Sequence, residues 1–186
     1  NSKIGLDTSG YGDINAFKAI NTDTVALTAN IKVTPYFKSG NDSCKGLAET
    51  FTITVKPSGQ VNDLADTIVC KDQQLKLAFT SNNTSDTIHF LWANDNTSIG
   101  LAAQGFGDSI SFTALNVDTF PKEATITVDP YLINGSDSCK GASKDFKITV
   151  NPKGQVNKPD NLILCSEDTC QTMVFKTKNT GGTTSY

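Results

Sequence analysis

Hydrophobic and polar residues alternate with a period of two along much of the chain. In "TIHFLWA", for example, Ile88, Phe90 and Trp92 fall on one face of an extended strand. Similar runs rich in Val, Ile, Thr and Phe are typical of half-buried strands, and turn-forming clusters such as "SNNTSD" separate them. No helical period of useful length is present, so the pattern predicts an all-β fold. Its predicted core positions are Trp92, Phe112, Ile126, Val128, Phe146, Ile148 and Val150.

The sequence repeats itself at an offset of about 95 residues. The stretch "SGNDSCKGLAETFTITVKPSGQVN" (residues 39–62) returns as "NGSDSCKGASKDFKITVNPKGQVN" (residues 134–157), and "IGLDTSGYGD" (residues 4–13) returns as "IGLAAQGFGD" (residues 99–108). This period is too long for a solenoid unit and suits a small β-sandwich. We therefore predict tandem immunoglobulin-like β-sandwich domains with Greek-key connections.

The stretches "KPSGQVN" and "NPKGQVN" close one copy of the repeat and open the next. They predict one complete domain over residues 58–153. Residues 1–57 are then the later strands of a preceding domain, and residues 154–186 open a third. Because these flanking pieces alone would expose unpaired sheet edges, we expect the native polypeptide to continue in both directions. Such short linkers leave little bending freedom between domains.

Composition narrows the classes of partner. The chain has 186 residues, 37% of them hydrophobic, a net charge of −3 and a pI near 5.0. All sixteen basic residues are Lys, whereas nucleic-acid binders rely on Arg for bidentate contacts with phosphate and guanine. No stretch approaches the roughly eighteen apolar residues that span a membrane. We expect neither a nucleic-acid partner nor membrane insertion.

Five cysteines in a polar, β-rich chain favour an oxidising, extracytoplasmic setting. The chain has no CxxC pair, and "CSEDTC" has no matching second pair or His, so disulfides are favoured over a metal site. A Cys70–Cys139 bond would close the complete domain on itself, although these positions can lie at opposite ends of an immunoglobulin topology. A bond between neighbouring domains and a Cys165–Cys170 bond are alternatives. The disulfide candidates are Cys44, Cys70, Cys139, Cys165 and Cys170.

No catalytic constellation is evident, and we expect the protein not to be an enzyme. The single histidine, His89, lies on the opposite strand face from Ile88 and Phe90 and has no Ser or Cys partner in register. We expect no cofactor. Calcium at the acidic loops Asn94–Ser98 and Asn134–Ser138 is the weaker alternative, because neither loop has the spacing of an EF-hand and Asn and Asp commonly cap turns.

The order of these motifs resembles a known family. "IVC" stands near the start of a unit and Trp92 on a middle strand; "ATITVDPYLINGSDSCKG" and "FKITVNP" follow. This resembles the PKD-like, immunoglobulin-like repeats of very large surface proteins in the Bacteroidota, including gliding-motility adhesins of the SprB type. The resemblance covers essentially the whole chain, once as a complete unit and twice as fragments. The "W-x-FGDG" run of standard PKD domains is missing, so the ligand properties of those domains are not carried over.

The resemblance implies a non-enzymatic repeat segment of a large secreted adhesin, acting as a rigid, load-bearing spacer or stalk in surface adhesion or gliding motility. It implies export by the type IX secretion system and attachment at the outer-membrane cell surface through the parent protein. The implied partners are neighbouring repeats, surface polysaccharide, and the secretion and gliding machinery. The alternative is a carbohydrate-binding module, using Tyr11, Tyr36, Phe106 or Tyr131, or a spacer domain of a secreted polysaccharide-degrading enzyme.

Four Asp-Thr/Ser-aliphatic triplets resemble the O-glycosylation signal of exported Bacteroidota proteins. The competing interpretation is that Asp-Thr simply leads from a turn into a strand. The candidate modification sites are Thr24, Thr67, Thr87 and Ser109.

Overall fold

The computed structural model describes residues 2–84, 86–135 and 137–186. In these ranges the secondary structure consists of strands β1 to β12 and two short 3-10 turns, which confirms the all-β prediction. The chain divides into two compact units. Unit 1 comprises residues 1–62, 80–90 and 129–143, and unit 2 comprises residues 63–79, 91–128 and 144–186.

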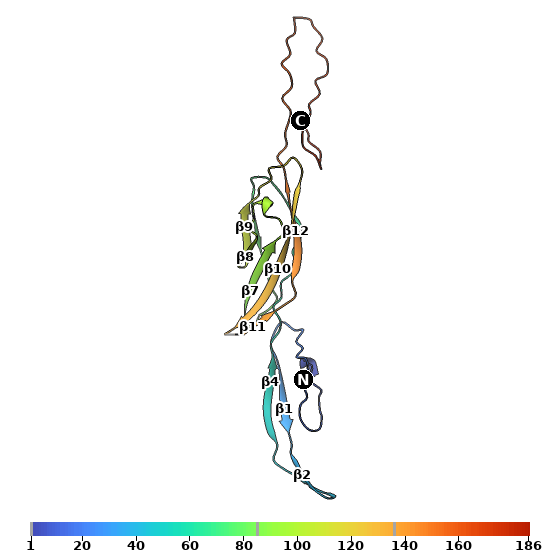
Figure 1. Ribbon diagram of the computed structural model, residues 1–186, viewed down its shortest axis with the longest axis vertical. Coiled ribbons are helices and arrows are strands. Elements are labelled where there is room, and N and C mark those ends of the chain that lie inside the picture. The colour runs from blue at the N-terminus through green and yellow to red at the C-terminus, as the bar shows by residue number, and fades with distance from the viewer. Residues whose placement is uncertain (1, 85, 136) are drawn as a thin grey trace. The chain divides into compact units, whose positions relative to one another are not determined.

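The largest sheet has the strand order β5-β12-β10-β7-β8, with β11 paired to β10; Figure 1 shows β10 and β12 side by side. The strands of this sheet are β5 (Thr67–Cys70), β7 (Thr87–Asn94), β8 (Gln104–Phe106), β10 (Lys122–Asn134), β11 (Asp137–Lys140) and β12 (Lys144–Asn151). β5 and β12 pair in parallel, with Thr67 opposite Ile148 and Cys70 opposite Asn151. β10 pairs antiparallel with both β11 and β12. A separate antiparallel pair joins β6 (Gln74–Ala78) to β9 (Ser109–Thr113).

The core of unit 2 consists of alternating positions on β9, β10 and β12, as expected where the inner faces of a sandwich pack. Six of the seven core candidates are buried there: Phe112, Ile126, Val128, Phe146, Ile148 and Val150. Trp92 is half-buried instead. It stands opposite Gly105 on β8, where an added Cβ would come within 2.2 Å of the indole ring. Gly105 therefore leaves space for the Trp92 ring to lie across the neighbouring strand.

A buried asparagine fixes the connection between β9 and β10. Asn116 Nδ2 donates to the carbonyls of Phe120 (2.8 Å) and Val150 (2.7 Å), and Asn116 Oδ1 accepts the Asp118 N–H (2.9 Å). One side chain thus holds the loop closed and ties it to the end of β12. In unit 1, Asn21 makes the corresponding bonds at positions 95 residues earlier, to the carbonyls of Val25 and Val55 and from the Asp23 N–H.

The flanking segments contain fewer strands. In unit 1, β1 (Leu27–Val33) pairs antiparallel with β4 (Glu49–Val55), and β2 (Tyr36–Ser39) pairs with β3 (Asp42–Lys45). Residues 154–186, all of them described, form no strand or helix. The boundaries predicted for the three domains, and their tandem arrangement, stay predictions.

Replacing Asn116 with Ala is expected to reduce the free energy of unfolding by about 1–3 kcal/mol, because the Val150 and Phe120 carbonyls lose their donor in a buried site. Chemical denaturation monitored by Trp92 fluorescence would measure the loss. The matched control is Asn21→Ala, which removes the equivalent bonds in unit 1 and should leave the Trp92 transition unchanged. Equal unfolding transitions for Asn116→Ala and the unaltered protein would contradict the stabilising role of the Asn116 hydrogen bonds.

Candidate functional site

The side chains that could bind a metal ion or take part in catalysis are dispersed over this fold. Within the described ranges, no three His, Cys, Asp or Glu side chains gather in a way that could hold a metal ion. His89 is half-buried on β7. None of the described helical turns is long and apolar enough to cross a membrane. The site with the most specific geometry is instead the linker of residues 57–62, here called the first linker; its counterpart at residues 152–157 is the second linker.

The first linker is buried although it lacks regular secondary structure. Pro57, Gly59 and Val61 are all buried. The Gly59 N–H donates to the carbonyl of Cys139 on β11 (3.0 Å). The linker backbone therefore lies against the hairpin formed by β10 and β11, and both it and the hairpin belong to unit 1.

Two glycines allow the linker and the hairpin to approach at backbone distance. A Cβ built on Gly59 would lie 2.7 Å from the carbonyl carbon and oxygen of Pro130, and a Cβ on Gly141 would lie 1.6 Å from the Gly59 carbonyl oxygen. Neither approach leaves room for a side chain. The Gly141 N–H donates to the Pro130 carbonyl (2.9 Å), which keeps the hairpin backbone in place beneath the linker.

The Asn83 side chain also holds the first linker in place by hydrogen bonds, and this set of bonds is called the clamp. Its Oδ1 accepts the Gln60 N–H (2.7 Å) and the Ser81 hydroxyl (3.0 Å), while its Nδ2 donates to the Ser58 carbonyl (3.2 Å). The Asn62 N–H adds a bond to the Thr80 carbonyl (2.8 Å). Bonds on both sides of Gly59 thus satisfy backbone groups that an irregular segment would otherwise leave to solvent.

The second linker carries the same clamp. Asn179 Oδ1 accepts the Gln155 N–H (2.7 Å) and the Thr177 hydroxyl (3.0 Å), and Asn179 Nδ2 donates to the Lys153 carbonyl (3.1 Å). Here the Thr180 N–H also donates to the Thr119 carbonyl (2.9 Å). The clamp therefore forms wherever this local sequence occurs.

The two linkers differ in burial. Pro152 is half-buried, and Gly154 and Val156 are exposed, whereas their counterparts in the first linker are buried. Among the described residues other than its chain neighbours, only Thr184 comes within 4 Å of a Cβ built on Gly154, at 3.9 Å. Among the described residues, no hairpin packs against the second linker in the way that residues 129–143 pack against the first.

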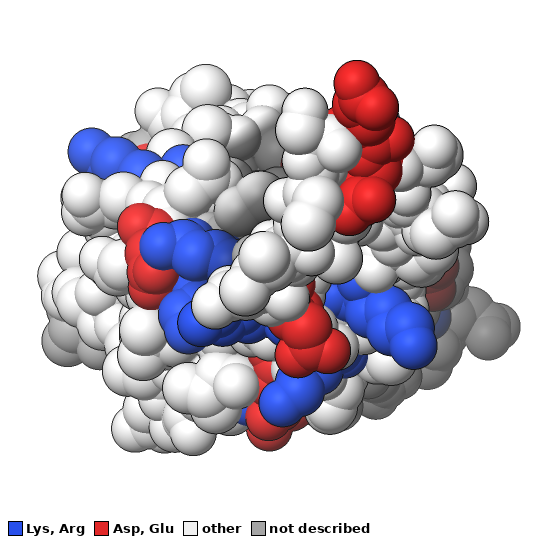
Figure 2. Space-filling view, turned by 90° about the horizontal axis from the view of Figure 1, so that it is seen from above, with Lys and Arg blue, Asp and Glu red and all other residues white. Residues whose placement is uncertain are grey.

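Ion pairs accompany both linkers. Lys153 lies 2.6 Å from Asp72, and its hydrogen bond lowers the pKa of that carboxyl. On the hairpin, hydrogen bonds from Lys140 and Ser143 lower the pKa of Asp129, and the bond to Asp129 in turn raises the pKa of Lys140. Figure 2 shows Lys side chains interspersed with Asp and Glu, so the charge is mixed on the face that it displays.

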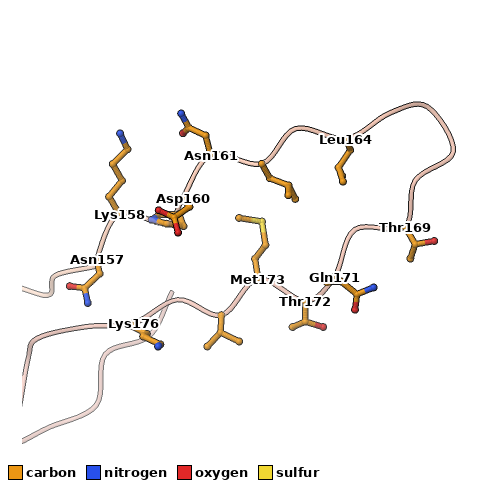
Figure 3. Close-up of a pocket in the computed structure, with 13 residues that line it drawn as sticks. Asn157, Lys158, Asp160, Asn161, Leu164, Thr169, Gln171, Thr172, Met173 and Lys176 are labelled. Carbon is orange, nitrogen blue, oxygen red and sulfur yellow. The ribbon is translucent and has the colours of Figure 1, made fainter.

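A shallow hollow of about 450 Å³ lies within residues 157–176. Figure 3 shows Met173 on one limb of this segment pointing across the hollow towards the limb that carries Asp160. Apolar and amide side chains dominate the lining, and Asp160 is its one carboxylate. The lining also contains Lys158 and Lys176, so it holds more cationic than anionic side chains.

All five cysteines are free thiols in this structure, and disulfide pairing stays a prediction. Cys70 stands opposite Asn151 at the end of β12, and Cys139 stands opposite Leu132 on β10. Cys139 is half-buried; Cys44, Cys70, Cys165 and Cys170 are exposed.

The glycosylation candidates lie where turns lead into strands. Thr67, Thr87 and Ser109 are the first residues of β5, β7 and β9, and Thr24 lies in a bend before β1. Thr87 is exposed and the other three are half-buried. The Asp66 carboxylate, which precedes Thr67, accepts the Lys147 N–H (2.8 Å), so this Asp has a structural role. Glycosylation of the four residues stays a prediction.

The oxygens of the first calcium candidate loop are engaged within the protein. Asn94 Oδ1 accepts the Asn96 N–H, Asn96 Oδ1 accepts the Ser98 N–H, and the Asp95 carboxylate accepts the Thr125 N–H. These bonds are those of a capped turn. The second loop, Asn134–Ser138, includes Ser136, which lies outside the described residues.

The aromatic candidates are mostly exposed. Tyr11, Tyr36 and Phe106 stand on the surface. Tyr131 is half-buried, and the Lys140 ammonium lies 5.7 Å from its ring centroid. Their recurrence at equivalent positions of the repeat therefore does not reflect burial in a core.

The clamp was missed by sequence reasoning, although a signal for it exists. A Ser/Thr-x-Asn triplet follows each "GQVN" stretch, as Ser81 to Asn83 and again as Thr177 to Asn179. The first triplet lies in "SNNTSD", which the sequence pattern indicates only as a turn. The linker N–H groups that the Asn side chains bind are more than twenty residues away.

Comparison with known proteins agrees with the described fold. Residues 67–154 match the family described as "PKD-like domain". The match begins with β5 and ends just beyond β12, so it covers the strands that build the core of unit 2. No curated protein matches the chain significantly. The PKD-like part of the predicted resemblance is thereby supported, in an all-β fold.

Replacing Asn83 with Ala should release the first linker, because the Gln60 N–H and the Ser58 carbonyl both lose their partner. We expect a loss of about 1 kcal/mol in stability and a fall in the backbone order parameter of Gln60 from about 0.85 to below about 0.6. NMR relaxation would measure the order parameter. The control is Asn82→Ala at the exposed neighbouring position. An unchanged Gln60 in Asn83→Ala would refute the clamp.

Proposed function

We propose that this chain is a non-enzymatic segment of a large secreted cell-surface protein, in which the PKD-like domain is a rigid, load-bearing spacer. The proposal is supported by the family match of residues 67–154, since PKD-like domains are immunoglobulin-like extracellular modules. The dispersed titratable side chains of the described residues offer no catalytic arrangement that would favour a competing enzymatic role.

The parallel pairing of β5 with β12 is the observation that carries the proposal. The chain enters the domain's first strand at Thr67 and leaves its last strand at Asn151, and the two strands run in the same direction, side by side. Tension along the chain therefore acts along both strands in opposite senses. The hydrogen bonds between them must shear together, whereas a hairpin pulled from one end would open one bond at a time.

The linkers extend this resistance beyond the domain. Asn83 and Asn179 fix the backbone of the first and second linkers by the same set of bonds. Lys153 adds its ion pair with Asp72, which lies in the turn after β5. A linker held at several points contributes little slack when the chain is pulled.

The setting that we propose follows the family resemblance. The parent protein is a surface adhesin exported by the type IX secretion system and attached at the outer-membrane cell surface, where it serves adhesion or gliding motility. Its partners are neighbouring repeats, surface polysaccharide, and the secretion and gliding machinery. Disulfides between exposed cysteines and O-glycosylation at Thr87 belong to this proposal.

Exposed aromatic side chains support a second candidate. Tyr11, Tyr36 and Phe106 present their rings to solvent, as carbohydrate-binding surfaces do. A carbohydrate-binding module, or a spacer domain of a secreted polysaccharide-degrading enzyme, would use the same fold. Binding of the full chain to a glycan array would favour this candidate.

Single-molecule pulling on the full chain tests the load-bearing role. We expect one unfolding event for the PKD-like domain, at a force that Asp66→Ala lowers because the Asp66–Lys147 bond joins the start of β5 to β12. The matched control is Asp108→Ala, which alters the same kind of triplet at the start of β9, a strand that does not connect to the chain ends. An extension without resistance, or equal unfolding forces in the two variants, would contradict the proposal.

A further inference from the structure

Part of the segment of residues 154–186 folds back onto the PKD-like domain. Its residues 176–181, here called the docking loop, contact the connection between β9 and β10, which comprises residues 114–121. The Thr180 N–H donates to the Thr119 carbonyl (2.9 Å), and Asn179 Nδ2 donates to the same oxygen (3.4 Å). All of these residues belong to unit 2. The segment is therefore joined to the domain both by the second linker and by the docking loop.

The burial of the segment shows where this attachment lies. Between residues 154 and 186, Thr177, Asn179 and Thr184 are half-buried, and every other residue is exposed. Thr177 and Asn179 belong to the docking loop, and Thr184 lies beside Gly154 of the second linker. The segment is thus covered only at the docking loop and next to the linker.

One amide side chain joins three stretches of backbone at this place. Asn179 Nδ2 donates to the carbonyl of Lys153 in the second linker and to that of Thr119. Asn179 Oδ1 accepts the Gln155 N–H and the Thr177 hydroxyl. These bonds use both donors and both lone pairs of the amide. The linker, the connection and the docking loop are therefore held together at one point.

The carbonyl that receives the docking loop is itself fixed in position. Thr119 lies between Asp118, whose N–H Asn116 Oδ1 accepts, and Phe120, whose carbonyl accepts from Asn116 Nδ2. Asn116 Nδ2 also donates to the Val150 carbonyl at the end of β12. The Thr119 carbonyl is thus held relative to the strand from which the chain leaves the domain.

Gly181 allows the docking loop to approach the connection closely. A Cβ built on Gly181 would lie 2.9 Å from Pro121 Cδ, and the Gly181 backbone has a φ of +74°. Glycine permits both the close approach and this left-handed conformation. The next residue, Gly182, has neither requirement: its backbone is not left-handed, and no described atom beyond its chain neighbours lies within 4 Å of its Cβ position.

We propose that the docking loop fixes the rotation of residues 154–186 about the second linker, so that the chain after the PKD-like domain is held in one orientation. A linker bound only along its own length can still turn about its backbone bonds. A second attachment, on the connection between β9 and β10, prevents this turning. The proposal deepens the spacer role, on which it rests for its purpose: such a spacer transmits twist as well as tension.

The strength of the attachment decides whether it can hold an orientation. Relative motion is the default for chain segments joined by a linker and a small polar interface. Two hydrogen bonds to the Thr119 carbonyl oppose it in this protein, from the Thr180 N–H and from Asn179 Nδ2. With the net strength that is typical of such bonds, they favour the docked arrangement by about tenfold or more. We therefore expect the docking loop to be bound in the large majority of molecules.

Residual dipolar couplings of the weakly aligned full chain test this orientation, because the couplings of one rigid body fit a single alignment tensor. The amides of β9 and β12 define the tensor for the core of unit 2. We expect the couplings of Gln155, Asn179 and Thr180 to fit that tensor in the unaltered chain. Couplings at these three residues that are averaged well below the fitted values would overturn the proposal.

Gly181→Ala should remove the docking contact and leave the clamp on the linker in place. The added methyl group meets Pro121, and a residue with a Cβ disfavours the left-handed backbone. We expect the Thr180 amide to exchange about tenfold faster, and the couplings of Gln155 and Asn179 to depart from the tensor of the core. Faster Thr180 exchange with couplings that still fit that tensor would overturn the proposal, because the contact would then not determine the orientation.

Gly182→Ala is the matched control, because it adds the same methyl group one residue later without a new contact. It should reproduce the exchange and the couplings of the unaltered chain, and a control that behaves like Gly181→Ala would contradict the role of the docking loop. The Trp92 fluorescence transition verifies that the domain is folded in each variant. The unfolding force of the PKD-like domain depends on β5 and β12 rather than on Gly181, so this proposal and the spacer role fail separately.

Discussion

The first linker is held in place by the close approach of the Gly59 backbone to the hairpin of β10 and β11. A Cβ on Gly141 would lie 1.6 Å from the Gly59 carbonyl, so no other residue fits there without movement. The linker is buried because of this approach, and its polar groups must then find partners inside the protein. The Gly59 bond to Cys139 and the Asn83 clamp supply them.

In the loops and linkers of this protein, asparagine side chains bind the backbone groups that a helix or a strand would pair elsewhere. Asn116 ties a loop to the end of β12, and Asn83 and Asn179 fix the linkers. An amide side chain suits these places because it donates and accepts at once and can satisfy two backbone groups of an irregular segment. Among the described residues, no buried side-chain nitrogen or oxygen lacks a partner. Loops and linkers are thus held in place where the chain has neither helix nor strand.

Alternation of apolar residues was enough to predict the strands and most of the core, because side-chain direction in a strand depends on local sequence alone. Ile126, Phe146 and Ile148 are buried for that reason. Trp92 departs from the pattern because a glycine on the neighbouring strand, Gly105, makes room for its ring at a partly open site. The linker clamps could not be predicted from local sequence, because the Asn83 side chain binds a residue more than twenty positions away. Gly59 and Gly154 have nearly the same sequence context, and among the described residues a hairpin lies only against Gly59.

Amide hydrogen exchange at the two linkers tests the central contact most directly. We expect slow exchange at Gly59, whose N–H is bonded to Cys139 and buried, and fast exchange at the exposed Gly154. Exchange at Gly59 as fast as at Gly154 would contradict the burial of the first linker against the hairpin.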